Sequence, residues 1–207
     1  MEKIKTMQTP AFFDTVPRIV VRDLLSETLG AASDGIIEYS YLDAVKLTGH
    51  SCPTVAGAYL MTMSALAHLY PDELPHRGEL QVELRQQIDE GVAGVIASVA
   101  CLITGAANAG GFKGLGGRFS RRDLLHFGVP MQGELRFTRL DTGQAVEVAH
   151  NGAAVPRPPD LINQLQAASD PRADAATRNE FAASWQGWVR TILLEHSDDP
   201  ALIAIMD

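Results

Sequence analysis

The hydrophobic and polar positions of the chain follow two different periods, which indicates a mixture of helices and strands. Apolar residues recur at helical spacing over residues 53–70 and 90–104, and the second segment is apolar on nearly every side. Residues 78–87 alternate with a period of two, which predicts a half-buried strand. Residues 133–140 and 144–150 predict a β-hairpin, because a turn sequence separates them. We therefore expect an α+β fold with a mixed β-sheet packed against two long helices.

The first part of the chain predicts shorter elements. Ser40 is a good N-cap residue for a helix over residues 41–47. A short strand over 19–21, a helix over 24–32 and a second short strand over 36–39 come before it.

The last quarter of the chain has a different pattern and predicts a helical extension. A proline-rich linker over residues 156–159 separates it from the rest, so we expect one domain over 1–156 and an extension over 157–207. A short helix over 161–168 and a longer one from Asp174 are expected there. The longer helix places aromatic side chains on one face, which needs a partner surface on the main domain or on a second subunit. These aromatic residues are Phe181, Trp185 and Trp188.

Composition and charge exclude several classes of function. The 207 residues are 46% hydrophobic and carry a formal net charge of -8, so a nucleic-acid partner is not expected. The longest nearly apolar run, residues 92–107, is shorter than the roughly 20 residues that cross a bilayer. No continuous apolar run follows Lys3 and Lys5, so no signal peptide is expected. Two cysteines are too few for a disulfide framework, and we expect a cytoplasmic protein without a membrane partner.

The sequence Gly49-His50-Ser51-Cys52-Pro53 carries the strongest candidate chemistry. Proline is favoured at the first helical position, so Cys52 is the expected N-cap of the long helix that follows. The positive end of the helix dipole favours its thiolate, and the imidazole of His50 can reach the same point. A thiolate and an imidazole suit zinc, iron, nickel or copper. The alternative is a packed, unreactive cysteine beside a histidine bonded to a carbonyl.

Three further residues are candidates to complete such a site. His126 is one, although a lone histidine in an apolar stretch is usually a core residue with a satisfied ring. Asp43 would supply a carboxylate or orient the imidazole of His50, or would instead complement the helix dipole in the first turn. Cys101 lies within the second apolar helix, where a packed, inert thiol is expected.

A glycine-rich segment over residues 104–119 is the second candidate site. It matches neither the Walker A pattern nor G-x-G-x-x-G, but such a loop can approach a ligand closely and present N–H groups to an anion. Four cations in or after it would favour a small anionic ligand: Lys113, Arg118, Arg121 and Arg122. A flexible turn with solvated charges is the alternative.

The segment from Gly49 to Pro53, with Gly57 after it, resembles the Gly-His-x-Cys-Pro-x-x-x-Gly motif of the FmdE family of formylmethanofuran dehydrogenase components. The sequence Leu102-Ile103-Thr104-Gly105 is similar to a second landmark of that family. The resemblance covers residues 40 to 125. It implies an α+β fold with a mixed sheet, a metal site usually read as zinc with His50 and Cys52 as ligands, and a homodimer.

This chain departs from the family pattern at three places. Thr48 stands where members often have a histidine, and Ala106 replaces a cysteine expected after the Thr-Gly pair. The C-terminal four-cysteine zinc ribbon of many members is missing, since the tail contains no cysteine. A reduced or differently completed metal site therefore follows from the resemblance.

Three functions remain open at this point. The first is a metal-binding protein, with zinc as the expected ion, that serves a redox enzyme as an accessory or carrier. The second is a hydrolytic enzyme in which an open metal position holds water. The third is a metal-free binder of a small anionic ligand at the glycine-rich loop. Whether the protein is an enzyme, and on which substrate, does not follow from these residues.

Overall fold

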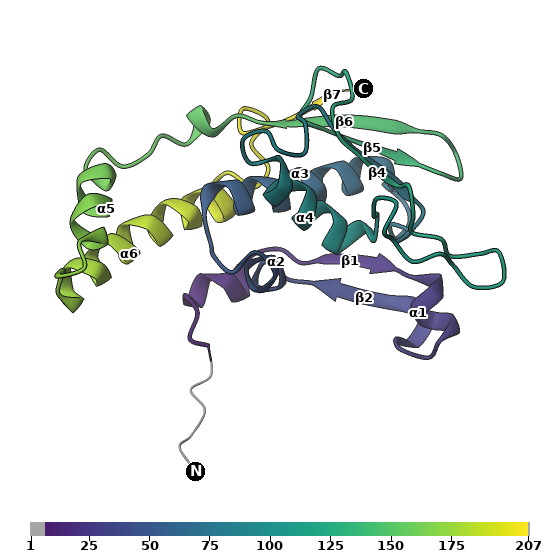
Figure 1. Cartoon of the computed structure of the whole chain (residues 1–207), viewed down its shortest axis with the longest axis horizontal. Helices are drawn as coiled ribbons and strands as arrows, with labels where there is room; N and C mark the ends of the chain where they lie inside the picture. Colours follow the sequence, from purple (N-terminus) through teal and green to yellow (C-terminus); the bar gives the residue numbers. More distant parts are fainter. Residues whose placement is uncertain (1–6, 207) are drawn as a thin grey trace, which may run out of the picture.

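The computed structural model describes residues 7–206 and arranges them in stacked layers (Figure 1). A five-stranded sheet forms one layer, the long helices α3 (Pro53–Leu69) and α4 (Ala93–Thr104) form the next, and a two-stranded sheet lies on their other side. This confirms the predicted α+β class. Within the described residues no helix is both long and apolar enough to span a membrane. Residues 1–6, which enter the signal-peptide prediction, lie outside the described residues.

The larger sheet is mixed, as predicted. Its strand order is β4-β3-β5-β6-β7, with β4 parallel to β3 and every other neighbouring pair antiparallel. Val82, Phe137 and Val146 are paired across the three central strands and are almost completely buried, so they form a continuous apolar row across the sheet. The strands are β3 (Leu80–Leu84), β4 (Leu125–His126), β5 (Leu135–Arg139), β6 (Ala145–His150) and β7 (Ile203–Met206).

Helix α3 is the centre of the core. It packs on α4 and β6, and its Tyr59 hydroxyl donates to the carbonyls of Pro17 and Tyr39 on the side of the smaller sheet. Contact on both sides explains why its apolar residues surround the helix rather than forming one stripe. Eleven of its residues are buried: Val55, Ala56, Gly57, Ala58, Tyr59, Leu60, Met61, Thr62, Ala65, Leu66 and Leu69.

The N-terminal elements form the layer below the two long helices. Strands β1 (Ile19–Arg22) and β2 (Ile36–Tyr39) make an antiparallel pair, and a 3-10 turn, η1 (Ala11–Thr15), precedes them. Between the strands lie α1 (Leu24–Thr28) and a second 3-10 turn, η2 (Ser33–Gly35). Helix α1 is shorter than the predicted 24–32. It ends early because Gly30 has φ +69°, a left-handed conformation that breaks the helical repeat.

The C-terminal quarter contains the predicted helices and one strand that the sequence pattern missed. After a 3-10 turn, η3 (Gly152–Ala154), helices α5 (Leu161–Ser169) and α6 (Ala175–Arg190) form a hairpin that extends away from the body (Figure 1). A π-helical turn, η4 (Thr191–Glu195), follows, and β7 then pairs with β6. The chain beyond residue 156 therefore returns to the sheet, so the prediction of a purely helical extension was wrong for its last residues.

Gly57 shows how closely α3 lies on the sheet. A Cβ at this position would lie 2.8 Å from Nδ1 of His150 on β6, nearer than real Cβ contacts allow. The imidazole of His150 thus packs against bare backbone, and burial lowers its pKa. The glycine of the sequence motif is required by this helix–sheet contact.

We expect Gly57→Ala to destabilise the fold by about 1–3 kcal/mol, because overpacking outweighs the better helix propensity of alanine. Gly187→Ala is a matched control in α6, since a Cβ there would have no atom within 4 Å. The control is expected to be neutral or to stabilise by up to about 1 kcal/mol. Urea unfolding of both variants measures the difference. Equal stability of the two would contradict the close packing at Gly57.

Candidate functional site

The loop from Gly49 to Pro53 connects helix α2 (Tyr41–Thr48) to α3, and helix α6 is docked on it. Trp185 Nε1 donates to the carbonyl of Ser51 over 2.9 Å, and Gln186 Nε2 donates to the same oxygen over 3.3 Å. The Ser51 hydroxyl donates to Gln186 Oε1 and lies 2.9 Å from the Tyr41 hydroxyl. This loop therefore anchors the helical hairpin to the body. The aromatic face of α6 thus packs on the main domain through Trp185, which is one of the two partner surfaces that the sequence left open.

Cys52 is the N-cap of α3, as predicted. Its Sγ accepts from the backbone N–H of Val55 over 3.5 Å, and Pro53 occupies the first helical position. His50 is exposed, and its Nδ1 lies 2.9 Å from the Thr48 carbonyl. A carbonyl only accepts hydrogen bonds, so in the neutral imidazole this contact places the proton on Nδ1 and leaves a lone pair on Nε2.

The other predicted ligands have local partners of their own. Asp43 forms a capping box with Ser40, accepting from its backbone N–H and its hydroxyl, which agrees with the helix-terminus interpretation. His126 lies on β4 at the edge of the sheet, with Nε2 3.0 Å from the Asp123 carbonyl. Burial raises the pKa of Cys101 to about 11, so its thiol is protonated at neutral pH. Over residues 7–206, no three His, Cys, Asp or Glu side chains are grouped as metal ligands.

The cations of the glycine-rich segment divide into two kinds. Lys113 is exposed, the Arg118 guanidinium lies over the Phe119 ring at 4.6 Å, and Arg122 Nε donates to the Ala109 carbonyl. Arg121 is different, because only 7% of its surface is exposed. Of the four predicted anion-binding cations, only this one is buried.

Arg121 belongs to a buried cluster with Asp23 and Arg77. Asp23 Oδ1 is 2.7 Å from Arg121 Nη2, and Asp23 Oδ2 is 2.8 Å from Arg77 Nη1. Asp23 Oδ1 also caps α1 by accepting from the N–H groups of Leu25 and Ser26. Burial by itself would raise the pKa of Asp23, but the two guanidinium groups and the capping N–H groups together lower it. Asp23 is therefore ionised at neutral pH.

The cluster holds two positive charges against one negative charge, and two of its donors have no acceptor. Arg121 Nη1 and Arg77 Nε are buried and find no hydrogen-bond partner within the described part of the chain. Arg121 packs directly on Gly78, where a Cβ would lie 1.1 Å from Nη1. The φ of Gly78 is +87°, so this position needs glycine for its conformation and for the arginine beside it. An unsatisfied buried donor costs about 1–3 kcal/mol.

A cavity of about 190 Å³ adjoins the two arginines. Its polar groups come from two distant segments, Arg77 and Glu79 from one and Ser120 and Arg121 from the other, and apolar side chains complete the wall. A water molecule occupies about 30 Å³ of liquid, so the space is large enough for a small tetrahedral or planar anion. The remaining lining residues are Leu24, Leu25, Gly78, Phe119 and Leu140.

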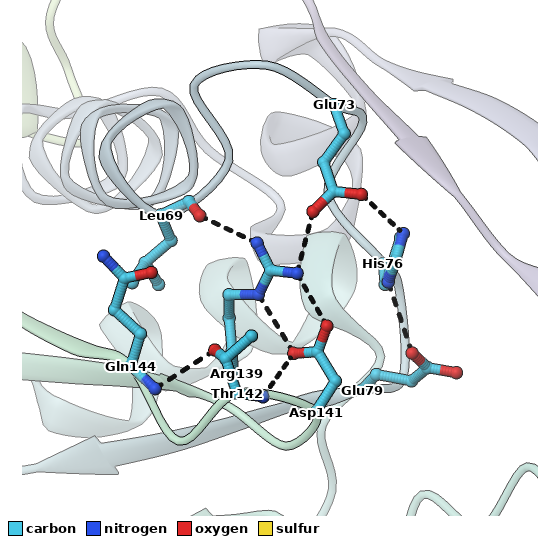
Figure 2. Close-up of polar contacts among 8 residues, drawn as sticks. All are labelled: Leu69, Glu73, His76, Glu79, Arg139, Asp141, Thr142 and Gln144. Carbon is cyan, nitrogen blue, oxygen red and sulfur yellow. Dashed lines mark hydrogen bonds and ion pairs between the residues drawn. The ribbon is translucent and has the colours of Figure 1, made fainter.

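A polar network lies beside this cavity (Figure 2). His76 lies between two carboxylates, with Nδ1 3.3 Å from Glu79 Oε2 and Nε2 3.7 Å from Glu73 Oε2. Arg139 bonds Glu73 and Asp141, and its guanidinium lies 3.9 Å from the centre of the Tyr70 ring. Glu79 joins the network to the cavity wall, because it contacts His76 and also lines the cavity.

Sequence reasoning found Arg121 but missed its partners. Asp23 stands directly before the helical residue Leu24, which is an N-cap signal that was available in the sequence. Arg77 and Glu79 carry no local signal, because they reach the cavity only through the pairing of distant segments. No protein-family model matches this chain, and no curated protein matches it.

We expect Asp23→Asn to destabilise the protein by about 3–5 kcal/mol, because the buried guanidinium of Arg121 and the partly buried one of Arg77 lose the carboxylate that pairs with both. Asp14→Asn, at an exposed carboxylate, is the matched control and should stay within about 0.5 kcal/mol of the parent protein. Because the folded-state pKa of Asp23 is lowered, its contribution is present at neutral pH and is lost on acidification. The loss begins only below the ordinary aspartate pKa of 3.8, so urea unfolding is measured at pH 7 and at about pH 2. Equal losses for the two variants at pH 7 would contradict the cluster's role.

Proposed function

We propose that the protein binds a small anionic ligand in the cavity between Arg77, Arg121 and the end of the glycine-rich segment. The observation that supports this function best is the buried guanidinium of Arg121, which lines the cavity and has an N–H group without an acceptor among residues 7–206. Arginine suits the planar, bidentate recognition of carboxylates and phosphates. Low local polarity strengthens such contacts relative to those of exposed cations.

The charged groups around the cavity limit how many negative charges a bound ligand can carry. Asp23 offsets one of the two arginines directly, and Glu79 faces the same space. A ligand with one or two negative charges would be bound, whereas a polyanion would meet the repulsion of both carboxylates. The third function considered from the sequence is thus the one that the described geometry favours.

To test this, we expect Arg121→Lys to weaken binding of inorganic phosphate at least tenfold, which equals about 1.4 kcal/mol. Lysine keeps the charge but loses the fork of donors. Arg118→Gln removes an exposed cation of the same segment and should leave the affinity nearly unchanged. Isothermal titration calorimetry is the readout, because phosphate also stabilises proteins non-specifically.

Leu140 provides a second pair of variants that avoids the buried cluster. Its side chain is 51% exposed and lines the cavity, so substitution there should preserve the fold. Leu140→Glu is expected to weaken phosphate binding more than Leu140→Gln, since only the former adds a negative charge. The absence of phosphate binding by the parent protein, or equal affinity of all these variants, would overturn the proposal.

A second candidate function is metal binding at His50 and Cys52, with zinc as the expected ion. The orientation of His50 favours it, because metal-bound histidines usually donate their other ring N–H to a carbonyl or carboxylate, as Nδ1 does to Thr48. A partner chain, such as the second copy of the proposed homodimer, or water would supply the remaining ligands. His126 stays a proposed additional ligand of the same metal. In this function the protein is an accessory or carrier, or a hydrolytic enzyme with metal-bound water.

Elemental analysis tests this second candidate. We expect about one transition metal per chain in the purified protein, and its loss in the double variant His50→Ala/Cys52→Ser. The variant Cys101→Ser is the matched control, because burial in α4 raises the pKa of that thiol to about 11 and keeps it protonated, which disfavours it as a metal ligand. Equal metal content in the parent and the double variant would exclude the His50 and Cys52 site.

A further inference from the structure

We propose that the cavity selects an oxyanion that still carries a hydroxyl group, such as hydrogen phosphate or a phosphate monoester, over sulfate. This inference rests on the proposed anion binding and names the class of ligand. It follows from the presence of a carboxylate, Glu79, in the wall of the same cavity as Arg77 and Arg121.

Arginine and carboxylate groups in one small cavity make complementary demands on a ligand. The guanidinium groups of Arg77 and Arg121 only donate hydrogen bonds, whereas an ionised carboxylate only accepts them. Glu79 is close enough to Arg121 to act on it electrostatically, and it favours the charged form of that arginine. A ligand that satisfies both walls therefore needs acceptor oxygens on one side and a donor on the other.

Hydrogen phosphate meets this requirement and sulfate does not. A phosphate monoester has a second pKa of about 6, so its protonated form is accessible near neutral pH and carries one hydroxyl. Sulfate carries no hydroxyl at these pH values, so its oxygens would face the Glu79 carboxylate without a hydrogen atom between them. A site built to accept a ligand's hydroxyl discriminates strongly against an analogue that lacks it.

The groups around Glu79 hold it in place as an acceptor. His76 Nδ1 lies 3.3 Å from Oε2 of Glu79, so the imidazole contacts one oxygen of this carboxylate. Arg121 and Arg77 lie on the cavity side, and Tyr70 is near enough for Glu79 to contribute to its raised pKa. Beyond His76 lies Glu73, which pairs with Arg139 (Figure 2).

The charge balance favours the same ligand. Asp23 and Glu79 together offset the charges of Arg77 and Arg121, so these four side chains have no net charge before a ligand binds. A singly charged, protonated oxyanion adds one negative charge and gives Glu79 a donor. A fully ionised dianion such as sulfate has no hydrogen atom to place between its oxygens and Glu79, so their repulsion is not relieved.

The test compares inorganic phosphate with inorganic sulfate at pH 7 by isothermal titration calorimetry on the full chain. We expect phosphate to bind at least tenfold more tightly than sulfate. Glu79→Gln should remove most of this preference, because the amide can donate to a sulfate oxygen. Glu73→Gln makes the same change in charge within the same network but outside the cavity wall, and should keep the preference.

Each outcome has a separate meaning. If neither anion binds to the parent protein, the proposed function fails, and this inference fails with it. If both anions bind equally, anion binding stands and the selection by Glu79 is overturned. Persistence of the phosphate preference in Glu79→Gln would also overturn it. Methyl phosphate and dimethyl phosphate provide an independent comparison, since only the first can carry a hydroxyl, and we expect at least tenfold weaker binding of the second.

Discussion

The pairing of one buried carboxylate with two arginines is the interaction on which the arrangement of the N-terminal layer depends. Asp23 caps α1 and joins it to Arg77 before β3 and to Arg121 after the glycine-rich segment. Three segments distant in sequence therefore meet at one side chain. Buried ion pairs of this kind add little net stability but are costly to break, so they fix which segments meet. Both arginines also line the cavity, and each keeps one buried N–H group without an acceptor among the described residues.

The motif that resembles the FmdE family has clear structural roles in this chain. Cys52 caps α3, Ser51 anchors α6, and Gly57 lets α3 approach the ring of His150. These contacts explain the residue types without any metal. His50 is the exception, because it is exposed and of its two ring nitrogens only Nδ1 has a local role, in the contact with the Thr48 carbonyl. The proposed metal site would therefore need ligands in addition to His50 and Cys52, because no third side chain is grouped with them among the described residues.

The two candidate sites differ in how the fold builds them. The metal candidate uses neighbouring residues in one loop, so local sequence presents His50 and Cys52 together. The anion cavity uses side chains from four segments, and its character depends on burial, because exposed arginines would be solvated and weakly selective. Glu79 adds a negative wall that a purely basic loop would lack. In the proposed function, this carboxylate would make the site selective among anions.

Local sequence patterns correctly predict the α+β class, the two long apolar helices, the hairpin of β5 and β6, and the N-cap at Cys52. These features follow from local periodicity and capping, which need no knowledge of distant residues. Tertiary structure decided the rest. Strand β7 pairs with β6 although helices α5 and α6 lie between them in the sequence. Strand β4 has only two residues, too few to show an alternating pattern. In the sequence, Arg121 is indistinguishable from the exposed cations near it. The fold buries it beside Asp23, and a contact between residues so far apart in the sequence leaves no periodic signal.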